Sequence, residues 1–353
     1  MKRCIFFIAF VLFSLACGGN CCGSEDISAK AAIVYEPCSD TALYEKLPDE
    51  RLPVASTTKI MTAKVILDNC ALDEVVCVNK EHTAIEGSSM YLKAGEKYTV
   101  EELLYGLMLA SGNDAAAALA DHCGGSMEAF AEMMNEEAQK LGLSNTHFEN
   151  SHGLDADGHY SSARDLALLT AAAMENEDFC KIFSTRYYTV QGTEYKNHNK
   201  LLSSCEGCIG GKTGYTEKAG RILVSCVERD DMRLICVTIS DPKDWEDHAA
   251  LYDKCFEEYE LYCVPDVCSS LDLISNTKDT VSLALAKSAI CIERGDELSL
   301  KVHLPRFVFP PLEAGEKAGF IELIGKERSY ACVDILFNET IDLHKSKGLK
   351  RSN

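Results

Sequence analysis

Three short motifs, in chain order, hold the residue types of an acyl-transfer site. They are Ser56-Thr-Thr-Lys59, Ser111-Gly-Asn113 and Lys212-Thr-Gly214. A serine hydroxyl is a poor nucleophile at neutral pH and needs a base within hydrogen-bonding distance. On a helix that starts near Ser56, Lys59 lies three residues ahead on the same face. Burial would lower the pKa of this lysine, so the first motif predicts a serine nucleophile with a lysine base.

The segment around the first motif predicts the helix that these roles require. Pro53 favours an extended approach to the motif. Apolar residues then recur at helical spacing, at Ile60, Ala63, Ile66 and Leu67. We expect the hydroxyls of residues 56–58 to cap the first turn. A capping serine followed by a solvated lysine is the alternative for this motif taken alone.

The second motif lies between two stretches that favour helix, Val100–Ala110 and Asp114–His122. It is therefore expected to form a tight turn, with Asp114 as the N-cap of the second helix. A plain turn is the alternative, but it does not require both polar residues. The Ser111 hydroxyl could relay a proton between the lysine base and a leaving amine, and the Asn113 amide could hold a substrate carbonyl.

The third motif is expected on a strand at the edge of a sheet. Apolar runs at 222–224 and 234–237 flank Glu228–Asp231, which predicts a hairpin beside it. Lys212 and Thr213 would present a charge and a hydroxyl to a terminal carboxylate. An ordinary surface strand with a glycine-rich start is the alternative.

In this order the three motifs resemble the signature of penicillin-binding proteins and class A β-lactamases. Longer blocks within roughly residues 27–260 are similar to the serine-type D-alanyl-D-alanine carboxypeptidases, which are low-molecular-weight penicillin-binding proteins. These blocks are Leu52–Thr62, Ser89–Lys93, Leu104–Met108, Ser111–Ala116, Asn145–Phe148, His152–Asp155, Gly158–Ser161 and Asn197–Leu202.

The resemblance implies a role for each matching position. Ser56 would be the acylated nucleophile and Lys59 its base, and Ser111 would assist proton transfer. Asn113 would bind substrate. Backbone amides of Ser56 and Tyr215 would form the oxyanion hole.

Further positions are implied to bind the substrate carboxylate. These are Lys212 and Thr213, with Gly214 beside them on the same strand. Tyr215 and His198 are also expected to bind substrate, and at these two positions some relatives carry His and Arg, respectively. The differences leave the reaction class unchanged and bear on how tightly substrate is held.

The implied activity is hydrolysis of the terminal D-Ala-D-Ala bond of peptidoglycan stem peptides, through an acyl-enzyme that β-lactams would also form. No cofactor and no metal are expected, and His152 and His159 are expected to be structural. A D,D-endopeptidase would use the same residues. A class A β-lactamase is disfavoured because no E-x-x-L-N pattern lies between the second and third motifs. The intact motifs disfavour a non-catalytic wall-binding protein.

The expected fold class is an α/β (α+β) penicillin-binding/β-lactamase-like domain, with an antiparallel sheet flanked by helices, followed by a small all-β domain. The first domain is predicted over residues 27–262. It would open with a hairpin of Lys30–Glu36 and Ala42–Glu45, continue with mainly helical residues 72–174, and close with a helix over Trp245–Tyr262.

A boundary is predicted near Val264-Pro265, followed by the all-β domain over residues 265–343. Turns are expected at Glu293–Asp296 and Glu313–Glu316. The remaining residues 344–353 form a polar, basic tail. It is too short and too polar for an amphipathic membrane helix. A solvated tail is favoured over peripheral contact with an anionic lipid surface.

The N-terminus predicts an exported protein, and the net charge bears on its partners. Lys2 and Arg3 precede an apolar stretch, Ile5–Ala16, typical of a signal peptide over residues 1–22. A lipid anchor at Cys17 is the less favoured alternative, because Ser14 and Leu15 fit a lipobox poorly. Losing the leader takes the net charge from −20 to about −22. Nucleic acid is therefore not an expected partner.

The chain has 18 cysteines, which is unusual for its size. Most lie singly in apolar runs, where cysteine behaves as a small hydrophobic residue. We expect most of them to be free thiols. Cys205-Glu-Gly-Cys208 is the best local candidate for a disulfide bridge.

Overall fold

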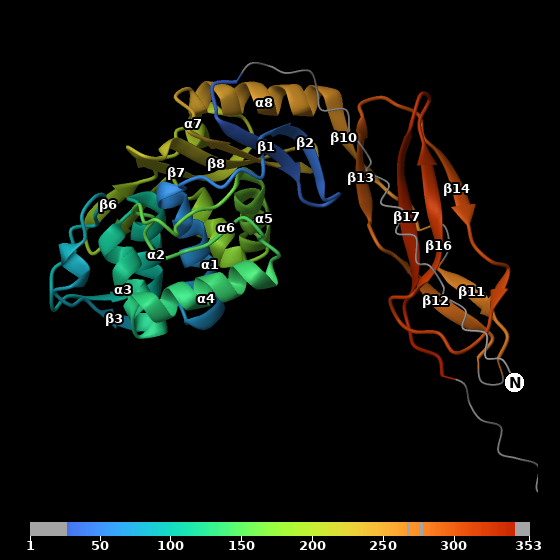
Figure 1. Ribbon diagram of the computed structural model, residues 1–353, viewed down its shortest axis with the longest axis horizontal. Helices are drawn as coiled ribbons and strands as arrows, with labels where there is room; N and C mark the ends of the chain where they lie inside the picture. The colour runs from blue at the N-terminus through green and yellow to red at the C-terminus, as the bar shows by residue number, and fades with distance from the viewer. Residues whose placement is uncertain (1–26, 267–268, 276–277, 343–353) are drawn as a thin grey trace, which may run out of the picture.

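A five-stranded antiparallel sheet forms the centre of the first domain (Figure 1). The computed structural model describes residues 27–266, 269–275 and 278–342. In spatial order the strands of the sheet are β2 (Thr41–Lys46), β1 (Ala31–Glu36), β9 (Met232–Ile239), β8 (Gly220–Arg229) and β7 (Cys208–Thr216). Segments from both ends of the domain thus share one sheet, and both predicted hairpins are confirmed.

The hairpin of β8 and β9 shows why these residues form strands. Both strands are buried along most of their length, because helices cover both faces of the sheet. Asp230 and Asp231 connect them with φ values of +50° and +63°. Two consecutive residues with positive φ give the turn whose twist matches a two-residue hairpin.

Helices cover the two faces of the sheet. The long helix α8 (Asp244–Glu258) packs on one face, where it meets β8 and β9. On the other face lie α1 (Lys59–Asn69), α5 (Ala163–Ala173) and α6 (Glu177–Ser184). Farther from the sheet lie α2 (Val100–Leu109), α3 (Asn113–Gly124) and α4 (Met127–Lys140). The expectation that residues 72–174 are mainly helical holds for 100–140 and 163–173, whereas residues 72–99 and 141–162 form short strands, turns and loops.

Short elements connect these helices. They are the 3₁₀-helices η1 (Ala55–Thr58) and η2 (His82–Ala84), the helix α7 (Leu201–Ser204), the hairpin β3 (Val75–Cys77) and β4 (Lys97–Thr99), and the hairpin β5 (Tyr187–Val190) and β6 (Thr193–Lys196). A capping box begins α2, in which Thr99 and Glu102 bond to each other's backbone.

Two local expectations are wrong. The closing helix ends at Glu258 instead of Tyr262, because the chain then extends as β10 (Tyr259–Cys263) and pairs with β13 (Ala289–Glu293). No disulfide joins any two of the cysteines that the structure describes, so Cys205 and Cys208 form no bridge. Their sulfur atoms are engaged elsewhere: Cys208 donates to the Gly210 carbonyl, and Cys205 lies beside an arginine side chain.

The second domain is all β, as expected. Its six-stranded sheet has the order β14 (Ser299–His303), β16 (Lys317–Ile324), β17 (Ser329–Phe337), β12 (Thr280–Leu285), β11 (Ser270–Leu273) and β15 (Phe307–Val308). Both predicted turns are present, each with a glycine in the left-handed region, Gly295 and Gly315. Its buried side chains form their own core. The predicted fold class is thus confirmed.

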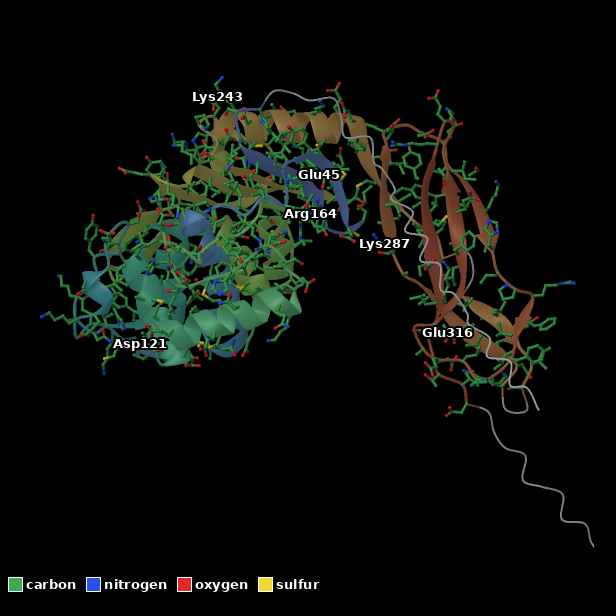
Figure 2. All side chains as sticks on the ribbon, viewed as in Figure 1. Glu45, Asp121, Arg164, Lys243, Lys287 and Glu316 are labelled. Atoms are coloured by element: carbon green, nitrogen blue, oxygen red, sulfur yellow. The ribbon has the colours of Figure 1, made fainter. Side chains whose placement is uncertain are left out.

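The domains meet beside the hairpin of β1 and β2, where Lys287 lies (Figure 2). The Lys287 ammonium donates to the Ser39 carbonyl at 3.0 Å. The division at residues 262–265 stays a prediction, and β10 lies before it while pairing with a strand after it. Within the described part of the chain, no helix has the length and apolar character to cross a bilayer. The predicted leader, Cys17 and the basic tail fall outside the described residues.

Candidate active site

The first motif lies where the chain passes from an extended segment into α1. Leu52 pairs with Ser161 in an isolated bridge, and Ala55 has a φ of +45° just before the serine. Ser56 then lies on η1, and α1 begins at Lys59. A non-glycine residue at positive φ stores strain and is common beside reacting groups. The backbone therefore turns sharply at Ser56.

The predicted capping by residues 56–58 is wrong. None of these hydroxyls caps η1 or α1. Thr57 Oγ1 donates to the Val54 carbonyl, and Thr58 Oγ1 bonds to His159 Nε2 at 2.7 Å. Because the serine hydroxyl does not cap the helix, it is available to the cleft.

Lys59 is the centre of a buried hydrogen-bond network. Its Nζ lies 2.9 Å from Ser56 Oγ, 2.7 Å from Asn113 Oδ1 and 2.6 Å from the His152 carbonyl oxygen. A carbonyl oxygen only accepts, so the amide and the peptide carbonyl take two N–H hydrogens. In the neutral amine the lone pair then faces the serine hydroxyl. This is the geometry of a general base for Ser56.

The electrostatics favour that neutral amine. Lys59 is completely buried. Burial lowers its pKa well below the ordinary lysine value, the charge of Lys212 lowers it further, and Asp114 opposes the shift. Desolvation disfavours the charged form of any buried amine. The lysine next to Ser56 can therefore accept a proton at neutral pH.

The second motif forms the turn between α2 and α3. Ser111 has a φ of +57°, and Asn113 begins α3. Asn113 Nδ2 donates to the Glu86 carbonyl at 2.6 Å, which fixes the amide so that its oxygen faces Lys59. The orientation of this amide is thus set by the loop before it.

Lys212 connects the third motif with the second by a hydrogen bond. It is buried on β7, and its Nζ donates to Ser111 Oγ at 3.0 Å and to the Thr213 carbonyl at 2.9 Å. Burial lowers the pKa of Lys212 to about 7. The three motifs, which lie far apart in the chain, therefore meet around two buried lysines that are each satisfied by hydrogen bonds.

A cleft of about 340 Å³ opens on this group. The predicted site residues that line it are Ser56, Ser111, His198, Thr213, Gly214 and Tyr215. Lys59, Asn113 and Lys212 lie buried behind it. The strand edge at β7 is open, since β7 ends the sheet. A peptide could add there by strand pairing.

The remaining predicted residues lie at the rim or beside the nucleophile. A Cβ on Gly214 would lie 3.2 Å from the Ser56 backbone nitrogen, so β7 passes close to the serine. Tyr215 is largely exposed. His198 is exposed at the rim of the cleft, and its pKa is lowered by partial desolvation and by the charge of Lys212. Neutral His198 offers hydrogen bonds to the cleft and no full charge.

The loop that supplies the His152 carbonyl is held from two sides. Gly153 has a φ of +88°, and a Cβ there would lie 1.9 Å from the Ala55 carbonyl oxygen. His159 Nδ1 accepts from the Glu149 amide, so its Nε2 carries the proton and donates to Thr58. Burial lowers the pKa of His159 to about 4 and that of His152 to about 3. Both histidines are thus neutral groups that help to position this loop.

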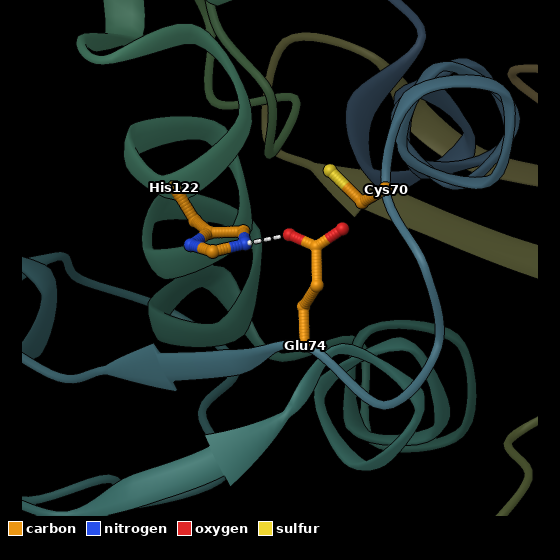
Figure 3. Close-up of side chains that lie close together, drawn as sticks. All are labelled: Cys70, Glu74 and His122. Carbon is orange, nitrogen blue, oxygen red and sulfur yellow. Dashed lines mark hydrogen bonds and ion pairs between the residues drawn. The ribbon is translucent and has the colours of Figure 1, made fainter.

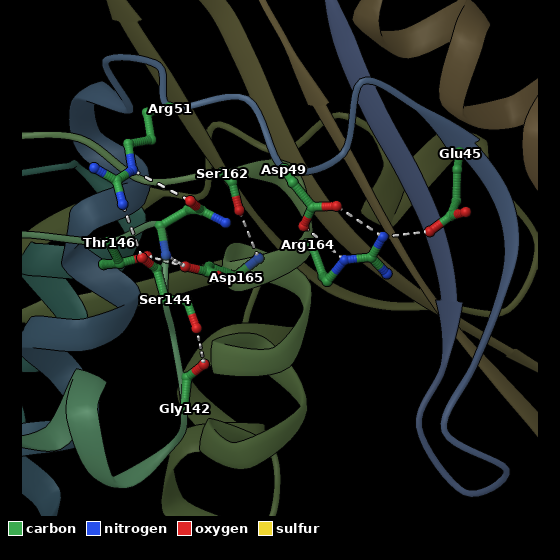
Figure 4. A network of polar contacts seen from close by, with 10 residues as sticks. Glu45, Asp49, Arg51, Gly142, Ser144, Thr146, Ser162, Arg164 and Asp165 are labelled. Atoms are coloured by element: carbon green, nitrogen blue, oxygen red, sulfur yellow. Dashed lines mark hydrogen bonds and ion pairs between the residues drawn. The ribbon is translucent and has the colours of Figure 1, made fainter. Parts of the chain in front are cut away.

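A polar network anchors the outer part of the same loop (Figure 4). Arg164 pairs with Glu45 and Asp49, which joins α5 to the hairpin of β1 and β2. Arg51 donates to the Ser144 carbonyl and to Asn145 Oδ1. These contacts fix residues 144–165 against the segment that leads into Ser56.

Two groups near the site are missed by sequence reasoning. Asp114 is not the N-cap of α3, because the helix already begins at Asn113. Its carboxylate accepts hydrogen bonds from Ser89 Oγ and from the backbone amides of Met90 and Leu92. Arg221 pairs with both carboxylate oxygens of Asp244 at 2.8 Å and lines the cleft.

The sequence signals for these groups are weak. Asp114 lies in a block that resembles the family, but which loop its carboxylate binds depends on tertiary structure. Nothing in the local sequence distinguishes Arg221 from any other charged residue on a strand.

Comparison with known proteins agrees with this geometry. Residues 20–243 match the model of the family described as D-alanyl-D-alanine carboxypeptidase. D-alanyl-D-alanine carboxypeptidase DacF of Bacillus subtilis is 32% identical over 315 residues, which is 84% of this chain and 81% of the relative. DacC of Escherichia coli, with the same description, is 40% identical over 235 residues, 63% of this chain and 58% of the relative.

Solved structures give the same result. Penicillin binding protein 5 from Haemophilus influenzae superimposes with a TM-score of 0.83 at 27% identity, covering 91% of this chain and 99% of that one. A serine-to-alanine mutant of the Streptomyces K15 DD-transpeptidase gives a TM-score of 0.64 at 36% identity, with 66% of this chain and 99% of that chain covered. Since the family match spans more than half of the sequence and agrees with the fold and the motifs, the chain belongs to the D-alanyl-D-alanine carboxypeptidase family of serine peptidases.

Proposed function

We propose that Ser56 is the nucleophile of a D-alanyl-D-alanine carboxypeptidase that trims peptidoglycan stem peptides. The observation that carries the proposal is the Lys59 network, in which two acceptor-only partners leave the amine lone pair for the Ser56 hydroxyl. Membership of the family supports the reaction class. The enzyme would work outside the cytoplasmic membrane, where this substrate lies.

In the acylation step the Ser56 proton passes to Lys59 while Oγ attacks the carbonyl carbon of the penultimate D-alanine. The Oγ–C bond forms and the peptide C–N bond breaks. Ser111, bonded to Lys212, would relay this proton from Lys59 to the leaving amine, which departs as D-alanine. A water molecule then hydrolyses the ester and restores Ser56.

In the transition state, negative charge develops on the oxygen of the attacked carbonyl, and hydrogen-bond donors must stabilise it. The backbone amide of Ser56 and that of Tyr215 are proposed for this role, and the close approach of Gly214 to the Ser56 nitrogen supports it. Each such donor typically contributes about 3 kcal/mol. Lys212 and Thr213 would bind the terminal carboxylate, with His198 and Arg221 at the rim of the cleft.

The same residues would react with β-lactams. A β-lactam places a strained amide where the scissile bond lies, so Ser56 would open the ring and carry a long-lived acyl group. Transfer of the acyl group to an amine in place of water is a second candidate, because the Streptomyces K15 protein with 36% identity is a DD-transpeptidase.

The test measures free D-alanine released from a peptide that ends in D-Ala-D-Ala. The protein without residues 1–22 is compared with its S56A variant and with S184A, which alters an exposed serine at the end of α6. We expect release by the parent and S184A and none by S56A, with a penicilloyl mass added to the parent and S184A only. Release that persists in S56A would overturn the proposal.

Two added substrates distinguish the alternatives. Glycine supplied as an amino acceptor reveals acyl transfer by the appearance of a new peptide. A cross-linked muropeptide reveals endopeptidase activity. If neither D-alanine nor any other product appears while the penicilloyl adduct forms, the protein binds wall peptides without trimming them, and the carboxypeptidase proposal fails.

A further inference from the structure

A second group of reactive side chains lies at the opposite ends of the helices that carry the active site (Figure 3). Cys70 follows the last residue of α1, Glu74 lies just before β3, and His122 is in the last turn of α3. Their sulfur, carboxylate oxygen and ring nitrogen all lie within 4.8 Å of one another. His122 Nε2 is 2.8 Å from Glu74 Oε2. The three side chains point toward one another from three different elements.

A fourth donor stands beside them. Cys123 follows His122 in the chain, and its thiol lies beside the Cys70 thiol. Both thiols are free and partly buried. The group thus holds two sulfur atoms, one imidazole nitrogen and one carboxylate.

The backbone around this group is well held. The Cys70 amide donates to the Ile66 carbonyl at 2.8 Å, and the Ala71 amide donates to Glu74 Oε1 at 2.7 Å. The Glu74 carbonyl accepts from the Val100 amide at 2.9 Å. The loop that carries two of the four side chains is therefore fixed to both α1 and the start of α2.

Charge and ligand type favour a cation there. The group lies at the C-terminal ends of α1 and α3, where the helix dipoles favour positive charge. Sulfur, nitrogen and oxygen donors together in a tetrahedral set are typical of zinc. An ordinary ion pair explains His122 with Glu74 but leaves the two adjacent thiols without a role.

We propose that Cys70, Glu74 and His122 bind a zinc ion and that Cys123 is the fourth ligand. Each thiol releases its proton to solvent when its sulfur bonds to the metal, and no electron transfer is involved. The side chains need only close from their present spacing to zinc–ligand distances of about 2.0–2.3 Å. Four protein ligands leave no open position, so the ion would be structural.

The role would be to clamp α1 to α3. These helices begin with Lys59 and Asn113, which bond to each other in the active site. Along α1 the zinc ligands lie about 16 Å from the catalytic lysine, at a rise of about 1.5 Å per residue. The ion would therefore stabilise the pair of helices without touching substrate.

The test uses the protein without residues 1–22, purified with a chelator under reducing conditions and then freed of the chelator. Zinc is titrated by calorimetry, and cobalt is titrated by absorption. We expect one ion per chain, a sulfur-to-cobalt charge-transfer band, and a rise in melting temperature with zinc. The variants C70S and H122A should each bind at least about tenfold more weakly, because each lacks one ligand. Circular dichroism checks that they are folded.

Matched controls separate these ligands from other thiols and imidazoles. C180S alters another partly buried cysteine and H147A another histidine, and both should bind zinc as the parent does. Absence of stoichiometric binding, or binding that C70S and H122A leave unchanged, would overturn the site. A Cys70–Cys123 disulfide in the protein as isolated from its native compartment would also overturn it. Full affinity in C123S would overturn the fourth ligand alone. None of these readouts depends on peptidase activity.

Discussion

At the scale of single residues, two lysines lie buried behind one cleft, and their hydrogen-bond partners give them different roles. Lys59 faces two acceptor-only oxygens and one hydroxyl, an arrangement that directs a lone pair at Ser56. Lys212 faces a hydroxyl and its neighbour's carbonyl, which suits a charged donor. The charge of Lys212 lowers the pKa of Lys59, so the two groups favour one neutral and one charged amine.

Replacing Lys212 with arginine should change the pH profile of the peptidase. Burial lowers the pKa of Lys212 to about 7, so its charge is present below that pH and is lost above it. In the parent, kcat/KM for the D-Ala-D-Ala peptide should therefore fall above about pH 7. Arginine stays protonated throughout, so K212R should lack this fall. Its maximum should be about tenfold lower, or about 1.4 kcal/mol in barrier, because the guanidinium has a different shape.

The measurement is kcat/KM for both proteins between about pH 5.5 and about pH 9, a range that includes the ordinary pKa of histidine and the lowered pKa of Lys212. S184A serves as the control for the assay itself. An unchanged alkaline fall in K212R would show that another group titrates there.

At the scale of elements, the nucleophile is positioned by a loop distant in sequence. Gly153 packs against the carbonyl of Ala55, the residue before the nucleophile, and the adjacent His152 carbonyl accepts from Lys59. One short loop thereby fixes both the serine and its base. The loop is held in turn by the Arg164 and Arg51 contacts and by neutral His159.

The variant G153A should lose activity through displacement of Ser56. A Cβ there would lie 1.9 Å from a backbone oxygen, so the loop or η1 must move. A shift of about 1 Å at a reacting group can cost about a hundredfold in rate. We expect kcat to fall at least about a hundredfold, with the rate of penicillin acylation falling in parallel.

The matched control is G142A. Gly142 also has positive φ, at +71°, but a Cβ there would meet nothing within 4 Å. It should lose only about 1–2 kcal/mol of stability from backbone strain and keep its kcat. Equal activity of the two variants would show that the contact with Ala55 does not position the nucleophile.

At the scale of the whole molecule, the two domains have separate cores. The sheet and helices of the first domain enclose two clusters of buried side chains, and the second domain encloses a third. The contacts that join them include the pairing of β10, which continues from α8, with β13, and those of Lys287 and Cys291 with Ser39. Separate cores favour separate unfolding of the two domains.

Thermal unfolding of the full protein should show two transitions, and acylation by penicillin should raise only the one that belongs to the catalytic domain. A ligand that binds only the folded state stabilises the domain that holds it. A gain of about 2 kcal/mol corresponds to a shift of about 4–8 °C for a domain of this size. S56A should show both transitions and no shift. A single transition that moves as a whole with penicillin would show that the domains unfold together.

Much of the active site could be predicted from sequence because its chemistry is local. Ser56 and Lys59 are one helical turn apart, and a helix fixes that distance. The edge strand with Lys212 and the two hairpins follow from alternating apolar runs and turn residues. The long blocks identified the family. The end of α8 could not be predicted, because Tyr259 to Cys263 extend only when β13 pairs with them.

What only the tertiary structure decided depends on residues far apart in the chain. The sequence predicted that Asp114 is the N-cap of a helix. In the folded protein its carboxylate instead accepts hydrogen bonds from residues 89–92. No sequence pattern predicted that Cys70 and His122 lie close together. The C-x-x-C spacing favoured a disulfide between Cys205 and Cys208 instead. Spacing along the chain determines contacts only within a helix turn or a hairpin, whereas contacts between elements depend on how their buried faces pack.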